Sequence, residues 1–212
     1  TAGQAAFAPR EVPHTYRVTM TAPDRRGLLS KAAGVLALNS LGVHSAAVNG
    51  VGGSAINTFV VSPQFGDPPA AELVRQQFIL ALRGELDVIG ALEKRDRDSA
   101  VHGTRRAGEP ALAVPAAVAA PPVILWHDGA GEGAALVEVR AADRTGLLAM
   151  LTRVFERAGV DIAWAKITTL GSSVVDVFAI SDPGAAGRQA LESALHAVLP
   201  SPPSGAPAQE AG

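Results

Sequence analysis

The sequence predicts an α/β fold of the α+β type, in which two copies of one small βαββα unit each form an antiparallel sheet with helices on one face. Three observations predict it. The segment 22–62 recurs as 141–181 without a gap, so that Asp143 falls 119 residues after Asp24. In each copy, alternating β-rich stretches flank a stretch with helical periodicity. Each copy also contains two such β-rich stretches joined by a short Gly/Ser turn, which is typical of a hairpin.

The duplication is clearest around one loop. APDRRGLLSKAAGV at 22–35 aligns with AADRTGLLAMLTRV at 141–154, and farther along Phe59 falls on Phe178. Most other positions exchange one apolar residue for another, which preserves a buried face. The two copies are therefore predicted to share one fold.

Each element follows from the local pattern. Alternating apolar residues predict the strands, and an apolar stripe at helical spacing after Gly-Leu-Leu predicts a first helix that lies on the sheet. The predicted elements of copies one and two are a first strand at 16–21 and 136–140, a first helix from Gly27 and Gly146, a second strand at 43–51 and 162–170, a third strand at 55–61 and 174–180, and a second helix at 70–83 and 185–199.

The borders of the copies are read from composition. A further short helix is expected at 86–97, and nothing comparable to the strand at 123–127 follows the last helix of copy two. The expected organisation is a linker at 1–14, repeat one at 15–97, an Ala/Pro-rich linker at 98–122, a strand at 123–127 that completes repeat one, repeat two at 134–199, and a disordered tail at 200–212. The sheet edge left unpaired in repeat two would take a strand from repeat one or from a second chain, which would allow a homodimer. The non-Met start suggests a piece of a longer protein.

Composition excludes several classes of function. Hydrophobic residues make up 48% of the chain, enough for a core, and the formal net charge of -2 gives no basic excess for nucleic-acid binding. The chain has no cysteine, which excludes disulfides, zinc ribbons and thiol catalysis and suits a cytoplasmic setting. No apolar run is long enough to cross a membrane, so a membrane partner is not expected.

Catalytic and metal-binding patterns are not evident, so no catalytic residue and no metal ligand is assigned. No serine lies in a nucleophile-elbow pattern, and the stretch 50–53 opens a strand rather than a helix, which favours a hairpin turn over a dinucleotide loop. The five histidines are scattered without the spacing of a metal site: His14, His44, His102, His127 and His196. No cofactor is expected in this chain.

The repeated Asp-Arg-x-Gly-Leu-Leu loop is the remaining candidate. A glycine at the helix start leaves backbone N–H groups open to a carboxylate, and an aspartate three residues earlier can accept hydrogen bonds from an ammonium group. One loop thus offers partners to both ends of a free amino acid. Helix capping by Asp24 and Asp143 explains the same residues without a ligand, and the loop alone leaves the two alternatives about equally supported.

A βαββαβ unit whose first strand runs into such a loop resembles the ACT domain, a ferredoxin-like regulatory module that binds amino acids. The pattern of DRTGLL, DVF and ISD in copy two, with APDRRGLL and NTFVVS in copy one, further resembles the C-terminal tandem ACT domains of the bifunctional PII uridylyltransferase/uridylyl-removing enzymes. This resemblance implies a glutamine-sensing, allosteric region that controls nitrogen assimilation. It also implies upstream nucleotidyltransferase and phosphohydrolase domains, Mg or Mn in the parent enzyme, and the PII protein as that enzyme's partner. In actinobacterial relatives the parent enzyme adenylylates PII.

The resemblance places ligand contacts in both loops and on the opposite repeat. In copy one and copy two respectively, the residues implied are Asp24, Arg25, Arg26, Gly27, Leu28 and Gly42, and Asp143, Arg144, Thr145, Gly146, Leu147 and Asp161. Copy one has Ser40 where the family has glycine before the second strand, and Arg26 and Thr145 replace the usual proline of the loop. The resemblance implies that the Asp24 loop pairs with Asp161, which puts a polar side chain on both walls, and that the Asp143 loop pairs with Gly42, which does not. We therefore expect the first composite site to be the better one.

A second class of function stays open from the sequence alone. A stand-alone tandem ACT protein, acting as an amino-acid-binding or interaction module, would show the same motifs. The two readings differ in whether catalytic domains precede this region in the polypeptide.

Overall fold

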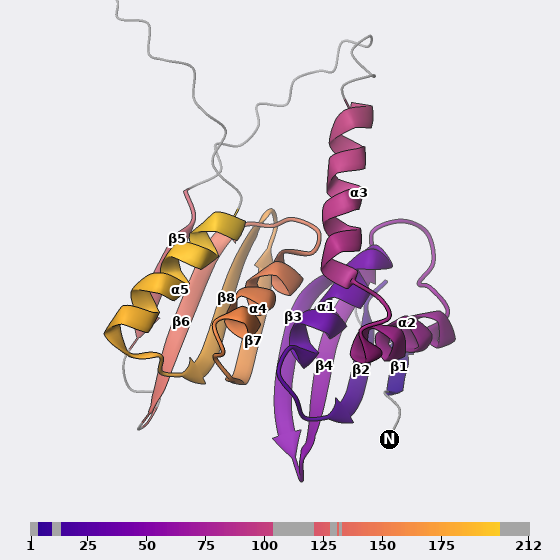
Figure 1. Ribbon diagram of the computed structural model, residues 1–212. Coiled ribbons are helices and arrows are strands. Elements are labelled where there is room, and N and C mark those ends of the chain that lie inside the picture. The colour runs from indigo at the N-terminus through magenta and orange to yellow at the C-terminus, as the bar shows by residue number, and fades with distance from the viewer. Residues whose placement is uncertain (1–3, 10–13, 104–120, 128–130, 132, 200–212) are drawn as a thin grey trace, which may run out of the picture.

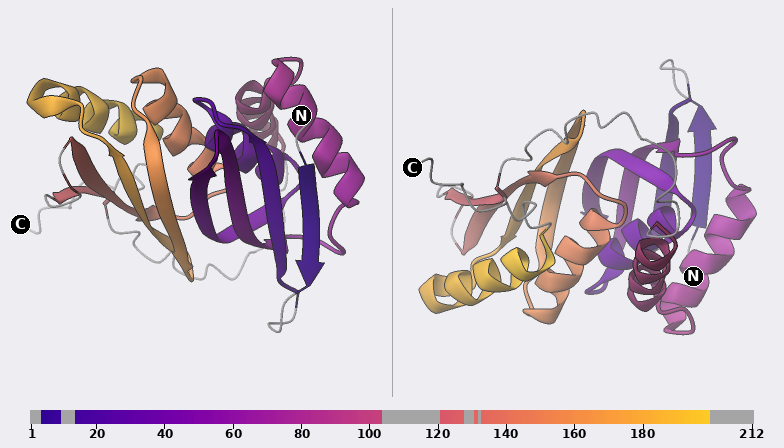
Figure 2. Two further views of the ribbon diagram at one scale, coloured as in Figure 1. Left: turned by 90° about the horizontal axis from the view of Figure 1, so that it is seen from below. Right: turned by 90° about the horizontal axis from the view of Figure 1, so that it is seen from above.

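The computed structural model describes residues 4–9, 14–103, 121–127, 131 and 133–199 (Figure 1). Two four-stranded antiparallel sheets form, with strand orders β1-β2-β4-β3 and β5-β6-β8-β7. The helices that belong to the two repeats lie on the same face of the sheets (Figure 2). The predicted α+β architecture with two ferredoxin-like repeats is therefore confirmed.

The elements of the first repeat follow the predicted order. They are β1 (Gln4–Pro9), β2 (Tyr16–Pro23), α1 (Leu28–Leu38), β3 (Leu41–Val51), β4 (Ser54–Pro63), α2 (Ala71–Arg83) and α3 (Val88–Gly103). In β4 buried and partly exposed residues alternate, so one face of this central strand lies against the helices.

Within the described residues, which end at 199, the second repeat reproduces this order without a counterpart of α3. Its elements are β5 (Val123–His127), β6 (Ala134–Ala142), α4 (Leu147–Arg157), β7 (Ile162–Leu170), β8 (Ser173–Ser181) and α5 (Gly184–Val198). The strand pairing keeps the offset of 119 residues, since Val18 pairs with Phe59 and Val137 pairs with Phe178. Of the residues described, no helix is long and apolar enough to span a membrane.

The closing strands correct two expectations. The strand at 123–127 does not complete repeat one, because β5 pairs with β6 and closes the sheet of repeat two. Repeat one is closed instead by β1, within the segment 1–14 that was expected to be a linker. The two closing strands occupy equivalent places, since Gln4 pairs with Thr21 and Val123 pairs with Arg140, each shifted by 119 residues.

The expectation of an unpaired edge in repeat two is therefore wrong, and with it the reason for expecting a borrowed strand. The expected short helix at 86–97 is the longer α3, which extends into the segment 98–122 that was expected to be a linker. The rest of that segment, 104–120, and the expected disordered tail at 200–212 lie outside the described residues.

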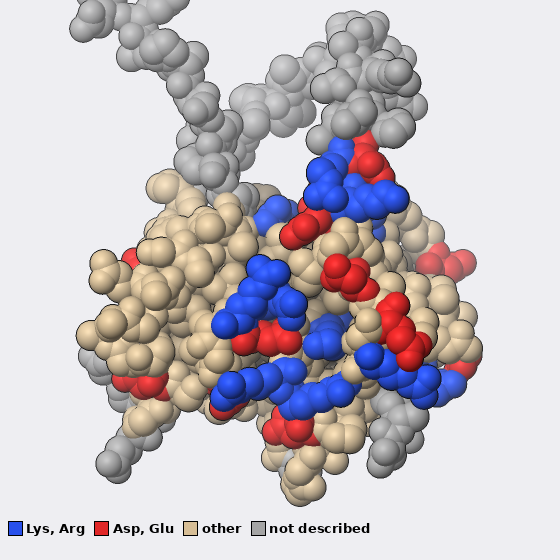
Figure 3. Space-filling model, viewed as in Figure 1, with Lys and Arg blue, Asp and Glu red and all other residues tan. Residues whose placement is uncertain are grey.

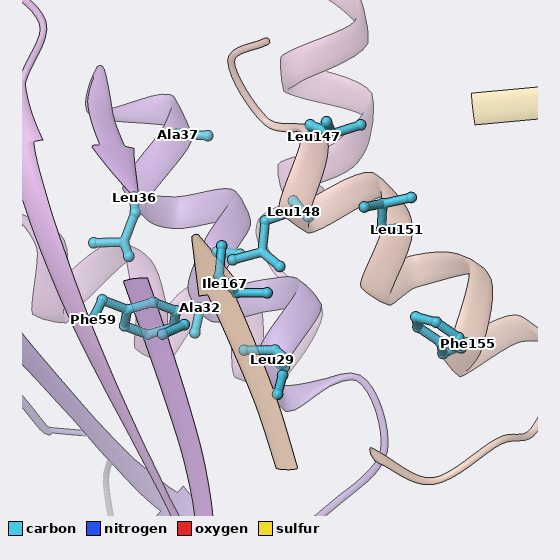
Figure 4. Close-up of a cluster of buried hydrophobic side chains, with 14 of the residues drawn as sticks. Leu29, Ala32, Leu36, Ala37, Phe59, Leu147, Leu148, Leu151, Phe155 and Ile167 are labelled. Carbon is cyan, nitrogen blue, oxygen red and sulfur yellow. The ribbon is translucent and has the colours of Figure 1, made fainter. Parts of the chain in front are cut away.

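The repeats lie side by side through equivalent elements. Strands β3 and β7 are neighbours at the facing edges of the two sheets, where the Thr169 hydroxyl donates a hydrogen bond to the Val43 carbonyl at 3.0 Å. Helices α1 and α4 pack against each other above this edge (Figure 2). Leu29 of α1, Leu148 of α4 and Ile167 of β7 belong to one continuous buried cluster (Figure 4). The core therefore runs through both repeats.

One backbone position differs between the repeats in a way that costs stability. Before β3, Ser40 adopts a left-handed φ of 54°, whereas the equivalent residue before β7 is Gly159, with φ 71°. A residue with a Cβ is strained in this region, and glycine is not. Serine in place of glycine at residue 40 thus keeps the tight turn but strains its backbone.

We expect Ser40→Gly to raise the free energy of unfolding by about 0.5–1 kcal/mol, because the relief of left-handed strain exceeds the added entropy of the unfolded chain. The reciprocal change, Gly159→Ser, should lower it by about 1 kcal/mol. Urea denaturation of both variants measures these values. Equal effects of the same sign from the two variants would contradict the assignment.

Candidate functional site

The two Asp-Arg-x-Gly loops have the same conformation. The backbone N–H of Asp24 donates to the Gly53 carbonyl at 2.9 Å, and that of Asp143 donates to the Ser172 carbonyl at 2.8 Å. Each loop is thereby tied to the hairpin turn of its own repeat. The helix then begins after a glycine with a left-handed φ, 76° at Gly27 and 80° at Gly146.

The loop geometry does not support the capping alternative. Gly27 and Gly146 are themselves the N-cap residues, and neither α1 nor α4 has a side-chain capping hydrogen bond. In an aspartate that capped the helix, the carboxylate oxygen would accept hydrogen bonds from the first-turn N–H groups. Helix capping therefore does not explain why aspartate stands at residues 24 and 143.

The loop arginines serve the structure of their own repeats. Arg25 donates to the carbonyl of Leu82 near the end of α2, and Arg144 donates to the carbonyl of Val198 at the end of α5. Cations at a helix C-terminus satisfy carbonyls that lack an intrahelical partner and interact favourably with the helix dipole. Of the expected ligand contacts, these two guanidinium groups are thus already engaged by helix ends.

The first pocket lies between the repeats, as the resemblance implied. A cavity of about 130 Å³ is lined by Asp24, Arg25, Arg26, Gly27 and Leu28 from repeat one together with Asp161 from repeat two. The structure therefore brings together all six residues expected for the composite site on the copy-one loop.

Arg26 and Asp161 close one side of this pocket with an ion pair between the repeats. The Arg26 Nε donates to Asp161 Oδ1 at 2.8 Å, and its Nη2 donates to Oδ2 at 3.3 Å. The hydrogen bond from Arg26 lowers the pKa of the Asp161 carboxyl. Both side chains are largely exposed, so the pair contributes little to stability and can be rearranged.

The second pocket is the pseudo-symmetric counterpart and is smaller. Its cavity of about 40 Å³ is lined by Asp143, Arg144, Thr145, Gly146 and Leu147 with Gly42 of repeat one. No side chain at residue 42 faces the loop, and Thr145 instead accepts a hydrogen bond from Gln64 at 3.1 Å. The structure assembles the expected residues here as well, but with about a third of the space.

Sequence reasoning missed one polar cluster at the first pocket. Glu156 of α4 lies against the N-terminal end of α1, where its carboxylate accepts hydrogen bonds from Ser30 at 3.0 Å and Arg153 at 2.7 Å. Lys31 lies 3.5 Å from the same carboxylate. Burial alone would raise the pKa of Glu156, but the hydrogen bonds from Arg153 and Ser30 and the nearby cations lower it.

The approach of Glu156 depends on glycine. A Cβ at Gly27 would lie 2.1 Å from a carboxylate oxygen of Glu156, so only glycine allows this contact. At the pseudo-symmetric place, Gly146 lies near Ala37 and Leu92, and the contact is apolar. Pairing each residue of α1 with its counterpart in α4 would have revealed the asymmetry, since Ala37 and Glu156 are 119 residues apart.

A second missed pair lies on the floors of the pockets. Asn57 of β4 lines the first pocket and Asp176 of β8 lines the second, and both residues are about 1% exposed. They are equivalent in the repeat, and each interrupts a stripe of buried apolar residues. Burial raises the pKa of Asp176 to about 7, with the nearby charge of Asp143 acting in the same direction and a hydrogen bond from the Thr168 backbone opposing it.

Charged side chains on one face of the molecule do not form a patch of one sign. Basic side chains form a band across the middle of one face, with acidic side chains between them (Figure 3). In the described part of the chain no three His, Cys, Asp or Glu residues are placed to hold a metal ion. Two histidines instead lie near single polar partners, His44 by Ser62 and His127 by Glu138.

Comparison with known proteins identifies relatives of the chain. No family model matches it. It is 56% identical over 182 residues to the bifunctional uridylyltransferase/uridylyl-removing enzyme of Mycobacterium tuberculosis, a match that covers 85% of this chain and 22% of that protein. The enzyme of the same name from Streptomyces coelicolor is 35% identical over 176 residues, covering 80% of this chain and 20% of the relative. The chain thus spans about a fifth of the length of the curated relatives it matches.

Among solved structures, an unknown protein from Galdieria sulphuraria is 17% identical to the chain. The match covers 87% of this chain and 91% of that one, with a TM-score of 0.28. That TM-score is too low to indicate a shared fold.

We expect Glu156→Gln to lower the free energy of unfolding at pH 7 by about 1–2 kcal/mol, because Arg153 and Lys31 lose their counter-charge in a half-buried place. The lowered pKa means that the charged form stabilises the fold at neutral pH and that this stabilisation is lost as the pH falls through the folded-state value. Urea denaturation at pH 7 and pH 3 should therefore show the difference shrinking in acid. Glu72→Gln, at an exposed pair with Arg75, is the control and should change stability little.

We expect Asp176→Asn to stabilise the protein increasingly as the pH rises. An unfolded Asp176 ionises near 3.8 and the folded one near 7, so between these values the folded state holds an extra proton and its stability falls with rising pH. Asparagine has no such titration and keeps the size of the side chain. The difference in unfolding free energy between variant and wild type should grow by a few kcal/mol, at about 1.4 kcal/mol per pKa unit, from pH 4 to pH 8. A difference that is independent of pH would contradict this.

Proposed function

We propose that this chain, which belongs to the family of bifunctional uridylyltransferase/uridylyl-removing enzymes and represents one region of such an enzyme, senses an amino acid, L-glutamine, and thereby regulates the enzyme. In this proposal the catalytic domains lie elsewhere in the same polypeptide, hold the Mg or Mn that nucleotide transfer and removal require, and act on the PII signalling protein. The resemblance of the two repeats to ACT domains supports the regulatory part of the proposal.

The observation that carries the proposal is the first composite pocket. It presents two carboxylates, Asp24 and Asp161, and one guanidinium, Arg26, around a cavity between the repeats. A zwitterionic amino acid has an ammonium group that can bind the carboxylates and a carboxylate that can bind the guanidinium. Such a ligand would separate Arg26 from Asp161. Its carboxylate would bind Arg26, and its ammonium group would bind Asp24 and Asp161.

This arrangement explains how binding would be transmitted. Because Arg26 and Asp161 belong to different repeats, a ligand that inserts between them changes the contact that joins the repeats. A ligand shifts an equilibrium only by its difference in affinity for the two states. Bound glutamine would thus favour the arrangement of this region and the catalytic domains in which the enzyme removes the nucleotide from PII. Without glutamine, the arrangement in which the enzyme attaches the nucleotide to PII would be favoured.

The second pocket is the less suitable site for the same ligand. It has a smaller cavity, no side chain at Gly42, and two acids, Asp143 and Asp176, while its loop arginine, Arg144, is bound to the end of α5. A ligand carboxylate would meet like charge there, which is unfavourable at close range.

Isothermal titration calorimetry of the chain with L-glutamine tests the proposal. We expect binding that D-glutamine does not reproduce, because three points of contact, with the ammonium group, the carboxylate and the side chain, distinguish the two enantiomers. Asp24→Ala should weaken binding by about tenfold, equivalent to about 1.4 kcal/mol. Asp143→Ala, the matched change in the second pocket, should leave the affinity nearly unchanged.

Two results would contradict the proposal. Folded wild-type protein that releases no heat at millimolar L-glutamine does not sense it. Equal losses from Asp24→Ala and Asp143→Ala would show that the first pocket has no special part in binding.

A further inference from the structure

Asn57 is out of place on the strand that carries it. Strand β4 buries Ala55, Asn57, Phe59 and Val61 on the face that lies against the helices, and Asn57 is the polar member of this stripe. It pairs with Met20 of β2 and Val48 of β3, so it lies at the middle of the sheet and away from any edge. Such a position normally holds an apolar residue.

Neither polar atom of the Asn57 side chain has a partner in the described part of the protein. Both Nδ2 and Oδ1 are buried and neither makes a hydrogen bond. Buried polar groups are nearly always hydrogen-bonded, and those that are not call for a functional explanation. The side chain lines the first pocket, which is also lined by Asp24, Arg26 and Asp161.

The chemistry of the unpaired group defines its complement. A carboxamide presents N–H donors and a carbonyl acceptor side by side, and another carboxamide satisfies both at once. A carboxylate offers only acceptors and would leave the Asn57 oxygen unpaired. An alkyl group offers neither.

From these observations we infer that Asn57 determines the specificity of the first pocket by recognising a carboxamide on the side chain of the bound amino acid. The inference rests on the proposed function and extends it, because the charged groups at the mouth of the pocket recognise any amino acid. Asn57, on the floor, distinguishes L-glutamine from amino acids of similar length. At the equivalent place the second pocket has Asp176, which lacks the two N–H donors of an amide and does not have this complementarity.

Calorimetry with L-glutamine, L-glutamate and L-norleucine tests the inference, since the three ligands have side chains of similar length and different ends. We expect wild-type protein to bind L-glutamine at least about tenfold more tightly than L-norleucine, because a site with buried polar groups rejects a ligand that leaves them unpaired. In Asn57→Leu the ratio of the two affinities should fall to about one.

Two further variants complete the design. Asn57→Asp, which places the second pocket's residue in the first, should lose the preference for L-glutamine while keeping the size of the side chain. Asp176→Asn, the matched change in the second pocket, should leave the ratio within about twofold of wild type. Thermal unfolding checks the fold of each variant, and Asn57→Leu should unfold at a higher temperature than wild type without ligand, because two unpaired polar atoms are removed.

The outcomes separate this inference from the proposed function. If wild type binds amino acids and Asn57→Leu and Asn57→Asp keep the wild-type ratio, the inference is wrong and the proposed function stands. If wild type binds none of the three ligands, both are wrong. If Asn57→Leu does not fold, Asn57→Asp alone decides, and an unchanged ratio in that variant overturns the inference.

Discussion

The contact between helices α1 and α4 is the constraint on which both pockets depend. Each pocket takes its loop from one repeat and its opposite wall from the other, so neither exists unless these helices, with the neighbouring edges of β3 and β7, hold the repeats side by side. The contact is apolar where Leu29 meets the cluster that contains Leu148, and polar where Glu156 reaches the start of α1. Non-directional burial supplies the attraction, and the hydrogen bonds to Glu156 fix the relative position.

The duplicated fold could be predicted from the sequence because periodicity and turn chemistry are local signals. The loops, the hairpins and most helix bounds follow from them, and the resemblance placed Asp161 opposite the Asp24 loop, where the structure has it. The closing strands were misassigned, since β1 was expected to be a linker and β5 was expected to complete repeat one. The two strands share no residues that mark them as equivalents, and strand pairing is decided by distant partners. Carrying the offset of 119 residues upstream would have found both.

The components of the site that escaped prediction are those whose meaning depends on burial. In the sequence, nothing distinguishes Asn57, Asp176 and Glu156 from other polar residues. Their burial becomes evident only from the sheets and from the contact between α1 and α4. The Asp-Arg-x-Gly loops each line one pocket, and their arginines Arg25 and Arg144 bind helix ends. The repeat is therefore symmetric in backbone and asymmetric in the polar groups that line its pockets.

The position of β1 and β5 has a consequence for the order of folding during synthesis. In each repeat the strand that closes the sheet precedes the βαββα unit it completes, so the ribosome delivers every strand of a sheet before the last helix emerges. Repeat one can complete its pairing before any of repeat two exists, and it then offers α1 and the edge of β3 as a finished surface on which α4 and β7 assemble. The region is thus suited to folding one repeat after the other, with repeat two assembling on the folded surface of repeat one.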